Sequence, residues 1–293
     1  MSASAPGHVL IFGLGYSGTA IAAAAAAAGY RVTGTSRRAD LQPPPGVAVV
    51  PFDAAADVIA TATHIVPTAA PAEDGDPVLA RYRAEIAAAP ALRWIGFLSS
   101  TGVYGDRGGD WVDERSEPRP TSLRARARRA AEEDWAALGA ARSVPVDLIR
   151  LAGIYGPGRS AFDELRAGRA RRIDKPGHAF GRIHLTDIAE GTLAAAQQAE
   201  HLSGLRVLNF NDDLPTEPAE VTAEAARLLG VVPPPLVPFA DVAAGMSEMG
   251  RSFWAESRRV SSVATQRALG RRWRYPTYRE GLAAIHVVET HQS

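Results

Sequence analysis

Three glycines near the N-terminus have the spacing of a dinucleotide-binding turn. Gly13, Gly15 and Gly18 form a G-x-G-x-x-G pattern directly after the apolar run Val9 to Phe12. The first glycine permits a tight turn, the second lets the backbone approach a pyrophosphate, and the third lets a helix lie close to the strand. The amides and dipole of that helix then face the anion. We therefore expect a dinucleotide site rather than a plain turn, and Tyr16 and Ser17 belong to it.

The residues after the next predicted strand, Tyr30 to Thr35, indicate which dinucleotide is bound. NAD-specific sites carry an Asp or Glu about 20 residues past the glycines, where it binds the ribose 2′-hydroxyl. This chain has Ser36, Arg37 and Arg38 at that place. A carboxylate would repel a 2′-phosphate, whereas guanidinium groups bind one in bidentate fashion. The sequence therefore predicts NADP(H), and the alternative is a solvated basic loop.

Further candidates follow the later predicted strands, because ligands of open α/β sheets bind outside the carboxyl ends of the strands. Polar and small residues after the predicted strands 47–52, 63–66 and 92–98 are Asp53, Thr68, Ala69, Ala70, Ser99, Ser100 and Thr101. Asp53 either caps the next segment or hydrogen-bonds adenine. The loop with Thr68 offers backbone against which a dinucleotide could lie.

The order of the predicted elements indicates the fold class. Strands alternate with helices up to a sixth strand, residues 146–151, which is typical of a Rossmann-type α/β protein with a doubly wound parallel sheet. After residue 157 the regular alternation ends, and the chain is predicted to form short strands and mainly helices. We expect an NADP-binding domain of residues 1–156 with a returning segment 182–212. Residues 157–181 and 213–293 would form a smaller, discontinuous C-terminal substrate lobe.

Composition excludes several kinds of function. Lys plus Arg and Asp plus Glu both number 32, so no net charge attracts the whole protein to nucleic acid or a membrane. The chain has no cysteine, and its histidines lack metal-ligand spacing, so we expect no disulfide and no metal site. No signal peptide is evident, and the apolar run Ala20 to Ala28 is too short to span a bilayer. A cytoplasmic protein with a small-molecule substrate is expected.

Several segments together resemble the extended short-chain dehydrogenase/reductase superfamily, which includes NAD-dependent sugar epimerases and dehydratases. These segments are residues 11–18, 97–105, 111–114, 150–158, 182–187 and 208–215, in the order found in the family. The resemblance implies a Rossmann fold and adds Leu151, Gly153 and Ile154 to the cofactor-binding residues. Most extended members use G-x-x-G-x-x-G, so the spacing here resembles an atypical branch of bacterial proteins with unassigned activity.

The predicted catalytic helix departs from the superfamily. Its members carry Tyr-x-x-x-Lys, in which Lys lowers the Tyr pKa and holds the nicotinamide ribose while Tyr exchanges the substrate proton. Arg124 and Arg128 stand at these positions, and residues 106–150 contain neither Tyr nor Lys. A guanidinium stays protonated, so Arg124 cannot exchange that proton. Arg128 could hold ribose, and Arg124 could bind an anion or stabilise an oxyanion. The alternative is a solvated basic helix face.

Other residues are candidates for the substrate site. The resemblance places Ser100 and Thr101 at the Ser/Thr position that orients the carbonyl, and it leaves Tyr104 and Tyr155 as nearby phenols. His184 lies in the segment that links the lobes beside the substrate in the family, although such a histidine is more often structural. Arg159 and Arg182 would supply an anion-binding rim, and Asp187 is expected to cap the helix that follows it.

We therefore expect an NADP(H)-dependent oxidoreductase of the atypical extended short-chain type. It would act on a small, anionic carbonyl or hydroxyl compound without a Tyr-Lys pair. One alternative is a catalytically inactive NADP(H)-binding sensor or regulatory protein. Another is a nucleotide-sugar epimerase or dehydratase, although the short segment 158–180 leaves little room for a large diphosphate. A monomer or a homodimer is expected. Many relatives dimerise through the helix that corresponds to the one from Ser122, but four arginines between 124 and 129 would oppose that contact here.

Overall fold

The computed structural model describes residues 7–38 and 40–291, and the chain forms two compact units. The first unit runs to residue 100 and includes residues 123–150 and 188–208. The second comprises residues 101–122, 151–187 and 209 onward. Each unit is therefore discontinuous in sequence, and each is described by itself below.

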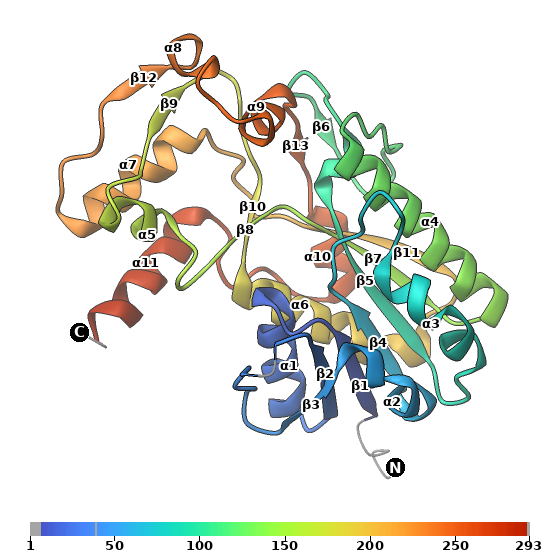
Figure 1. Ribbon diagram of the computed structural model, residues 1–293. Helices are drawn as coiled ribbons and strands as arrows, with labels where there is room; N and C mark the ends of the chain where they lie inside the picture. Colours follow the sequence, from blue (N-terminus) through green and yellow to red (C-terminus); the bar gives the residue numbers. More distant parts are fainter. Residues whose placement is uncertain (1–6, 39, 292–293) are drawn as a thin grey trace. The chain divides into compact units, whose positions relative to one another are not determined.

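A seven-stranded sheet in the order β11-β7-β5-β4-β1-β2-β3 forms the centre of the first unit (Figure 1). Its strands are β1 (His8–Phe12), β2 (Arg31–Ser36), β3 (Val47–Pro51), β4 (His64–Pro67), β5 (Trp94–Ser100), β7 (Val146–Leu151) and β11 (Leu205–Phe210). Strand β1 pairs in parallel with β2 and β4, and the pairs β2–β3 and β4–β5 are also parallel. The predicted Rossmann-type α/β fold is confirmed.

The strand order changes direction between β1 and β4. The chain runs from β1 outward through β2 to β3, then returns to β4 and continues outward through β5 and β7 to β11. Ligands of open α/β sheets bind at such a switch point, outside the carboxyl ends of the strands. Here the two central strands end at Phe12 and Pro67, directly before Gly13 and Thr68.

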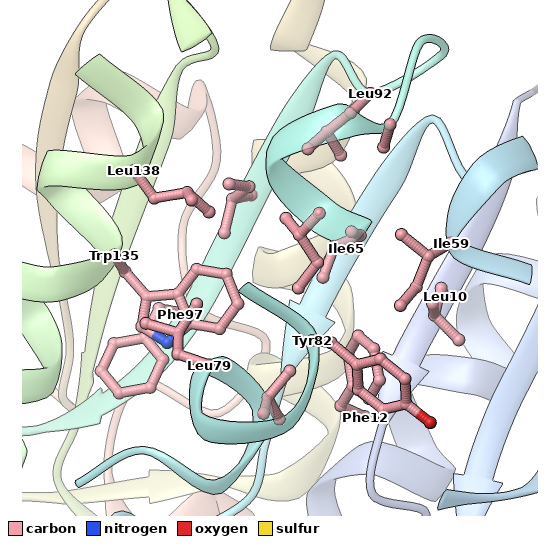
Figure 2. Close-up of a cluster of buried hydrophobic side chains, with 14 of the residues drawn as sticks. Leu10, Phe12, Ile59, Ile65, Leu79, Tyr82, Leu92, Phe97, Trp135 and Leu138 are labelled. Atoms are coloured by element: carbon pink, nitrogen blue, oxygen red, sulfur yellow. The ribbon is translucent and has the colours of Figure 1, made fainter. Parts of the chain in front are cut away.

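Helices α2 (Ala56–Thr61), α3 (Pro77–Ala88) and α4 (Leu123–Arg142) contribute to the main hydrophobic core of the first unit (Figure 2). Phe12, Ile65 and Phe97 of the strands meet Tyr82 of α3 and Trp135 of α4, and these five side chains are fully buried. Helix α1 (Tyr16–Ala27) contacts β1, β2 and β3, with small side chains such as those of Ala22 and Ala25 buried. Helix α6 (Leu185–Gln197) precedes the short turn η3 (Ala199–His201).

The second unit consists of short parallel strand pairs and helices. The pairs join β8 (Gly153–Tyr155) to β10 (Arg182–His184), β9 (Arg172–Asp174) to β12 (Leu236–Pro238), and β6 (Trp111–Val112) to β13 (Arg259–Val260). The helices are α5 (Ala161–Arg166), α7 (Pro218–Leu229), α8 (Phe239–Ala243), α9 (Glu248–Ala255), α10 (Val263–Leu269) and α11 (Tyr278–Thr290), with the turn η2 (Thr101–Tyr104). A cluster around Phe162, Tyr278 and Leu282 joins α5, α7 and α11.

Neither Asp53 nor Asp187 is the N-cap of a helix, so the predicted cap at Asp187 is wrong and the capping alternative for Asp53 does not hold. Asp53 lies in the turn η1 (Phe52–Ala54), and the residue that precedes α2 is Ala55, without a side-chain cap. Asp187 lies in the first turn of α6 instead of before it. Its carboxylate accepts from the backbone amides of Arg274 at 2.6 Å and Tyr275 at 3.1 Å, so it fixes a distant loop of the second unit.

No helix in the described part of the chain has the length and apolar character that crossing a membrane requires.

Candidate functional site

The predicted glycine turn joins β1 to α1 by a backbone that only glycine fits at two positions. Gly13 has a φ of +108°, a conformation that L side chains rarely adopt. Its amide donates to Thr35 Oγ1 at 3.1 Å, and its carbonyl accepts from Thr68 Oγ1 at 2.7 Å. A Cβ on Gly18 would lie 2.0 Å from the Gly13 carbonyl oxygen. The turn and the start of α1 are therefore held closely together at the end of β1.

Gly15 has a different environment from its two neighbours in the motif. It precedes α1 as the N-cap, makes no side-chain cap, and is exposed. A Cβ added there would meet no atom within 4 Å. The first amides of α1 thus open onto space at a helix N-terminus, where the peptide dipoles favour an anion. These residues fit the pyrophosphate of a dinucleotide, and Tyr16 and Ser17 form the first turn of the same helix.

The basic residues after β2 lie on the surface. Ser36 ends β2, and its Oγ accepts from the amide of Arg38 at 2.9 Å, which forms a local turn. The side chains of Arg37 and Arg38 are exposed. Asp53, after β3, is also exposed, whereas Thr68 and Ala69 after β4 are half-buried and Ala70 is exposed. The sheet thus brings the ends of β1, β2, β3 and β4, with these residues, to one edge of the first unit.

The end of β5 carries the next candidates. Ser100 is the last residue of β5 and is half-buried, while Ser99 is buried and its Oγ donates to Glu132 Oε1 at 2.6 Å. Thr101 follows in η2 and is buried. The Ser99 hydroxyl is therefore bonded within the unit, and Ser100 is the more accessible of the two serines.

Arg128 is not part of a solvated helix face. Its guanidinium donates to the carbonyl of Leu98 at 2.8 Å and lies 6.0 Å from the ring centroid of Phe97. Burial lowers the pKa of Arg128, nearby Asp76 raises it, and nearby Arg124 lowers it. Arg124 is exposed and lies within electrostatic range of Arg128. Arg128, at the family's Lys position, therefore lies beside the end of β5, and Arg124, at the Tyr position, lies about one turn before it on the same helix.

A buried ion pair that the sequence analysis missed anchors α4. Arg150 on β7 donates to both carboxylate oxygens of Glu132, at 2.9 and 2.7 Å, and the exposed fractions of their side chains are 2% and 0%. Arg129 also donates to Glu132, at 3.1 Å. The signal was present in the sequence, because Arg150 lies in the otherwise apolar end of a predicted strand. A charge there requires a buried partner.

Asp76 is a second missed carboxylate in the first unit. It caps α3 and accepts from the amides of Val78 at 2.9 Å and Leu79 at 3.0 Å. Its exposed fraction is 3%, and burial raises the pKa of its carboxyl. Since it lies within electrostatic range of Arg128, it adds a titratable group beside the arginine pair.

The two candidate phenols of the second unit are bonded within the fold. Tyr104 is fully buried, and its hydroxyl donates to Asn209 Oδ1 at 2.8 Å. The Tyr155 hydroxyl donates to the carbonyl of Thr277 at 3.4 Å, and burial raises the pKa of Tyr155. Both phenols therefore have structural partners, which does not favour them as proton donors to a substrate.

The other candidates of the second unit are also engaged in its structure. His184 Nδ1 accepts from the amide of Thr186 at 3.1 Å, and burial lowers the pKa of His184 to about 4, so the ring is neutral near pH 7. Arg182 donates to the carbonyls of Phe180 at 3.0 Å and Thr216 at 3.1 Å.

The remaining candidates near the start of the second unit lie on or beside its strands. Leu151 ends β7 and is buried. Gly153 and Ile154 pair with Arg182 and Ile183. Arg159 is exposed.

Comparison with known proteins identifies relatives over nearly the whole chain. The chain is 40% identical to a functionally unknown conserved protein from Silicibacter pomeroyi DSS, with a TM-score of 0.86 over 97% of this chain and 99% of that one. Protein YeeZ of Escherichia coli K12 is 30% identical over 77% of this chain and 85% of its own length. The structure of MoeE5 in complex with UDP-glucose and NAD is 22% identical, with a TM-score of 0.76 over 98% and 100% of the chains, which shows a shared fold.

The family follows from these similarities and from the glycine turn at the switch point of the sheet. The profile of the NAD dependent epimerase/dehydratase family matches residues 9–209, more than half of the chain. The chain belongs to the NAD-dependent epimerase/dehydratase family.

Proposed function

We propose that the chain binds NADP(H) and is an oxidoreductase that acts on a small, anionic carbonyl or hydroxyl compound without a Tyr-Lys pair. The observation that carries the proposal is the combination of two features of one sheet edge. Gly15 opens the N-terminus of α1 to an anion, and two exposed arginines follow the neighbouring strand β2. Residues 36–38 contain no carboxylate that would repel a 2′-phosphate.

The choice between NADP and NAD depends on Arg37 and Arg38. MoeE5, a protein of similar fold, was solved with NAD, so the fold itself does not select the phosphorylated form. Guanidinium groups supply paired N–H donors whose geometry matches phosphate oxygens. Arg37 and Arg38 would hold the 2′-phosphate, and the amides of α1 would hold the pyrophosphate. The dinucleotide would lie against the backbone of the loop from Thr68 to Ala70.

The residues beside β5 suggest how the chain would assist the reaction. When bound, NADPH supplies a hydride. A guanidinium carries five N–H donors, and the bond from Arg128 to Leu98 leaves others that can reach ribose hydroxyls. Arg124 would bind the anionic group of the substrate or stabilise negative charge on the carbonyl oxygen. The Ser100 hydroxyl would orient that oxygen, and solvent would supply the proton, because both phenols are hydrogen-bonded elsewhere.

Binding is tested by titrating the purified protein with NADPH and NADH, using the quenching of protein fluorescence. The proposal predicts tighter binding of NADPH, and Arg37→Gln with Arg38→Gln should abolish that preference. Arg115→Gln with Arg119→Gln is the matched control, because it removes two exposed arginines from a loop of the second unit. Equal affinities of the wild-type protein for the two dinucleotides would contradict NADP(H) specificity.

Activity is tested with NADPH and a panel of small aldehydes, ketones and keto acids. Ser100→Ala and Arg124→Gln should lower kcat/KM, and Arg124→Gln should do so more for keto acids than for neutral ketones. Absence of turnover across the panel would reject the oxidoreductase part of the proposal.

A nucleotide sensor remains the second candidate, and the bonded phenols are the observation that favours it. Tyr104 and Tyr155 both have structural partners, and Arg124 cannot exchange a proton near neutral pH. A sensor would bind NADPH tightly, would show no turnover, and would be insensitive to Ser100→Ala in any binding assay.

A further inference from the structure

A pocket in the second unit contains none of the residues considered for the dinucleotide or the substrate. Its volume is about 500 Å³, and it lies among β13, α10, the turn after α10, Trp111 of β6 and the segment after β11. This volume is within the range of small-molecule sites. All of its lining residues belong to the second unit, so the pocket is complete within one compact part of the chain.

Three arginines give the pocket a positive character. Arg267 lies in the last turn of α10, and Arg271 and Arg272 follow the glycine that ends the helix. The side chains of Arg267 and Arg272 are exposed, and that of Arg271 is half-buried. Asp213 also lines the pocket, and its carboxylate accepts from Gln266 Nε2 at 2.8 Å. Three guanidinium groups therefore outnumber the one exposed carboxylate.

Asp212 also lines the pocket, but its carboxyl group is buried. Asp212 is 1% exposed, and its Oδ1 accepts weakly from the amide of Arg182, at 3.3 Å. Its Oδ2 has no hydrogen-bond partner among the described residues. Because this oxygen is closed to solvent, it does not contact a ligand in the pocket, and burial raises the pKa of Asp212 to about 8.

Apolar side chains complete the lining. Trp111 is 56% exposed and Val263 is 59% exposed, although side chains of these types are usually more buried. Tryptophan stacks well on flat rings, and its side chain loses little conformational entropy when a ligand binds. The pocket thus offers cationic donors and an exposed aromatic surface.

We propose that this pocket is a binding site for a phosphate ester that carries a flat ring. Arg267, Arg271 and Arg272 hold the phosphate, and Trp111 stacks on the ring. Phosphate is favoured because guanidinium groups match its oxygens in bidentate geometry, and the three arginines together with Asp213 leave two positive charges, which balance a dianion.

The test uses the full chain and titrates it with phenyl phosphate, inorganic phosphate and phenol by ligand-observed NMR at pH 7.5. Phenyl phosphate should bind more tightly than either of the other two. Arg267→Gln with Arg272→Gln should weaken its binding by about tenfold or more. Trp111→Ala should weaken phenyl phosphate by roughly fivefold and leave inorganic phosphate unchanged.

Two controls separate this site from other effects. Arg227→Gln with Arg279→Gln removes two exposed arginines from α7 and α11 and should leave phenyl phosphate binding unchanged. Arg37→Gln with Arg38→Gln should also leave it unchanged, which distinguishes the pocket from the dinucleotide site. The proposal is overturned if phenyl phosphate does not bind at millimolar concentration, binds no better than inorganic phosphate, or loses equal affinity in the α7–α11 control.

Discussion

Glu132 on α4 and Arg150 on β7 form a bidentate ion pair, with N···O distances of 2.9 and 2.7 Å and almost no exposure of either side chain. Ser99 at the end of β5 donates to the same carboxylate, at 2.6 Å. The pair thus ties the helix that carries Arg124 and Arg128 to two strands of the sheet. Buried contacts in the core, and not contacts on the surface, therefore fix the orientation of α4.

Breaking this pair from one side should destabilise the fold strongly. Glu132→Ala leaves the Arg150 guanidinium buried without its partner, at a cost of about 3–5 kcal/mol in the free energy of unfolding. The double variant Glu132→Leu with Arg150→Leu removes both charges and should lose clearly less. Urea denaturation measures both values. A single variant as stable as the wild type would show that the pair does not anchor α4.

The glycines of the motif should respond differently to alanine. Gly18→Ala places a Cβ 2.0 Å from the Gly13 carbonyl oxygen, so it should lower the melting temperature or prevent folding. Gly15→Ala meets no atom within 4 Å and should leave the melting temperature nearly unchanged. It should nevertheless weaken dinucleotide binding by about tenfold or more, because the Cβ occupies the approach of the pyrophosphate. Thermal unfolding with and without NADPH measures both effects, and undiminished binding by Gly15→Ala would argue against a pyrophosphate there.

Arg128 should matter for cofactor binding. Arg128→Gln removes a charged donor beside the end of β5 and should weaken NADPH binding by about tenfold, equivalent to about 1.4 kcal/mol. Arg126→Gln, at an exposed position of the same helix, is the control. Isothermal titration calorimetry compares the two variants. If both bind NADPH as the wild type does, Arg128 has a packing role through Leu98 and Phe97 alone.

Asp212 should make stability depend on pH. Its folded-state pKa of about 8 lies above its ordinary value of 3.8, because desolvation outweighs the favourable charge of Arg182 and is reinforced by Asp213. Between these values the folded protein holds a proton that the unfolded chain releases, so this group lowers the free energy of unfolding as pH rises from about 4 to 8. The free energy of unfolding of Asp212→Asn, minus that of the wild type, should therefore be larger at pH 9 than at pH 5.

Asp241→Asn, at an exposed position of α8, is the control for that comparison, and urea denaturation at both pH values is the measurement. A pH dependence unchanged by Asp212→Asn would assign it to another group.

The sequence predicted the sheet well because its strands are short apolar runs with clear ends. Each predicted strand from Val9 to Leu151 matches an observed one within a few residues, and the charged helix after Ser122 is α4. Such local signals depend on hydrophobic periodicity and on turn residues, which a single sequence displays.

The site residues were harder to predict where contacts between distant segments determine their partners. Glu132 and Arg150 are 18 residues apart and meet only because α4 packs on the sheet at β5, the neighbour of β7. Asp187 looks like a cap by its position before a predicted helix, yet its carboxylate binds the amides of Arg274 and Tyr275, 87 and 88 residues away. The pocket of Trp111 and Arg267 likewise joins segments that no local pattern connects.

The central claim is that guanidinium groups after β2 select the phosphorylated dinucleotide. The most direct measurement compares dissociation constants for NADPH and NADH in the wild type, in Arg37→Gln with Arg38→Gln, and in Arg115→Gln with Arg119→Gln. We predict a preference for NADPH of tenfold or more, about 1.4 kcal/mol, that disappears only when Arg37 and Arg38 are replaced. Equal affinity for the two dinucleotides in the wild type, or a preference that survives loss of Arg37 and Arg38, would contradict the account.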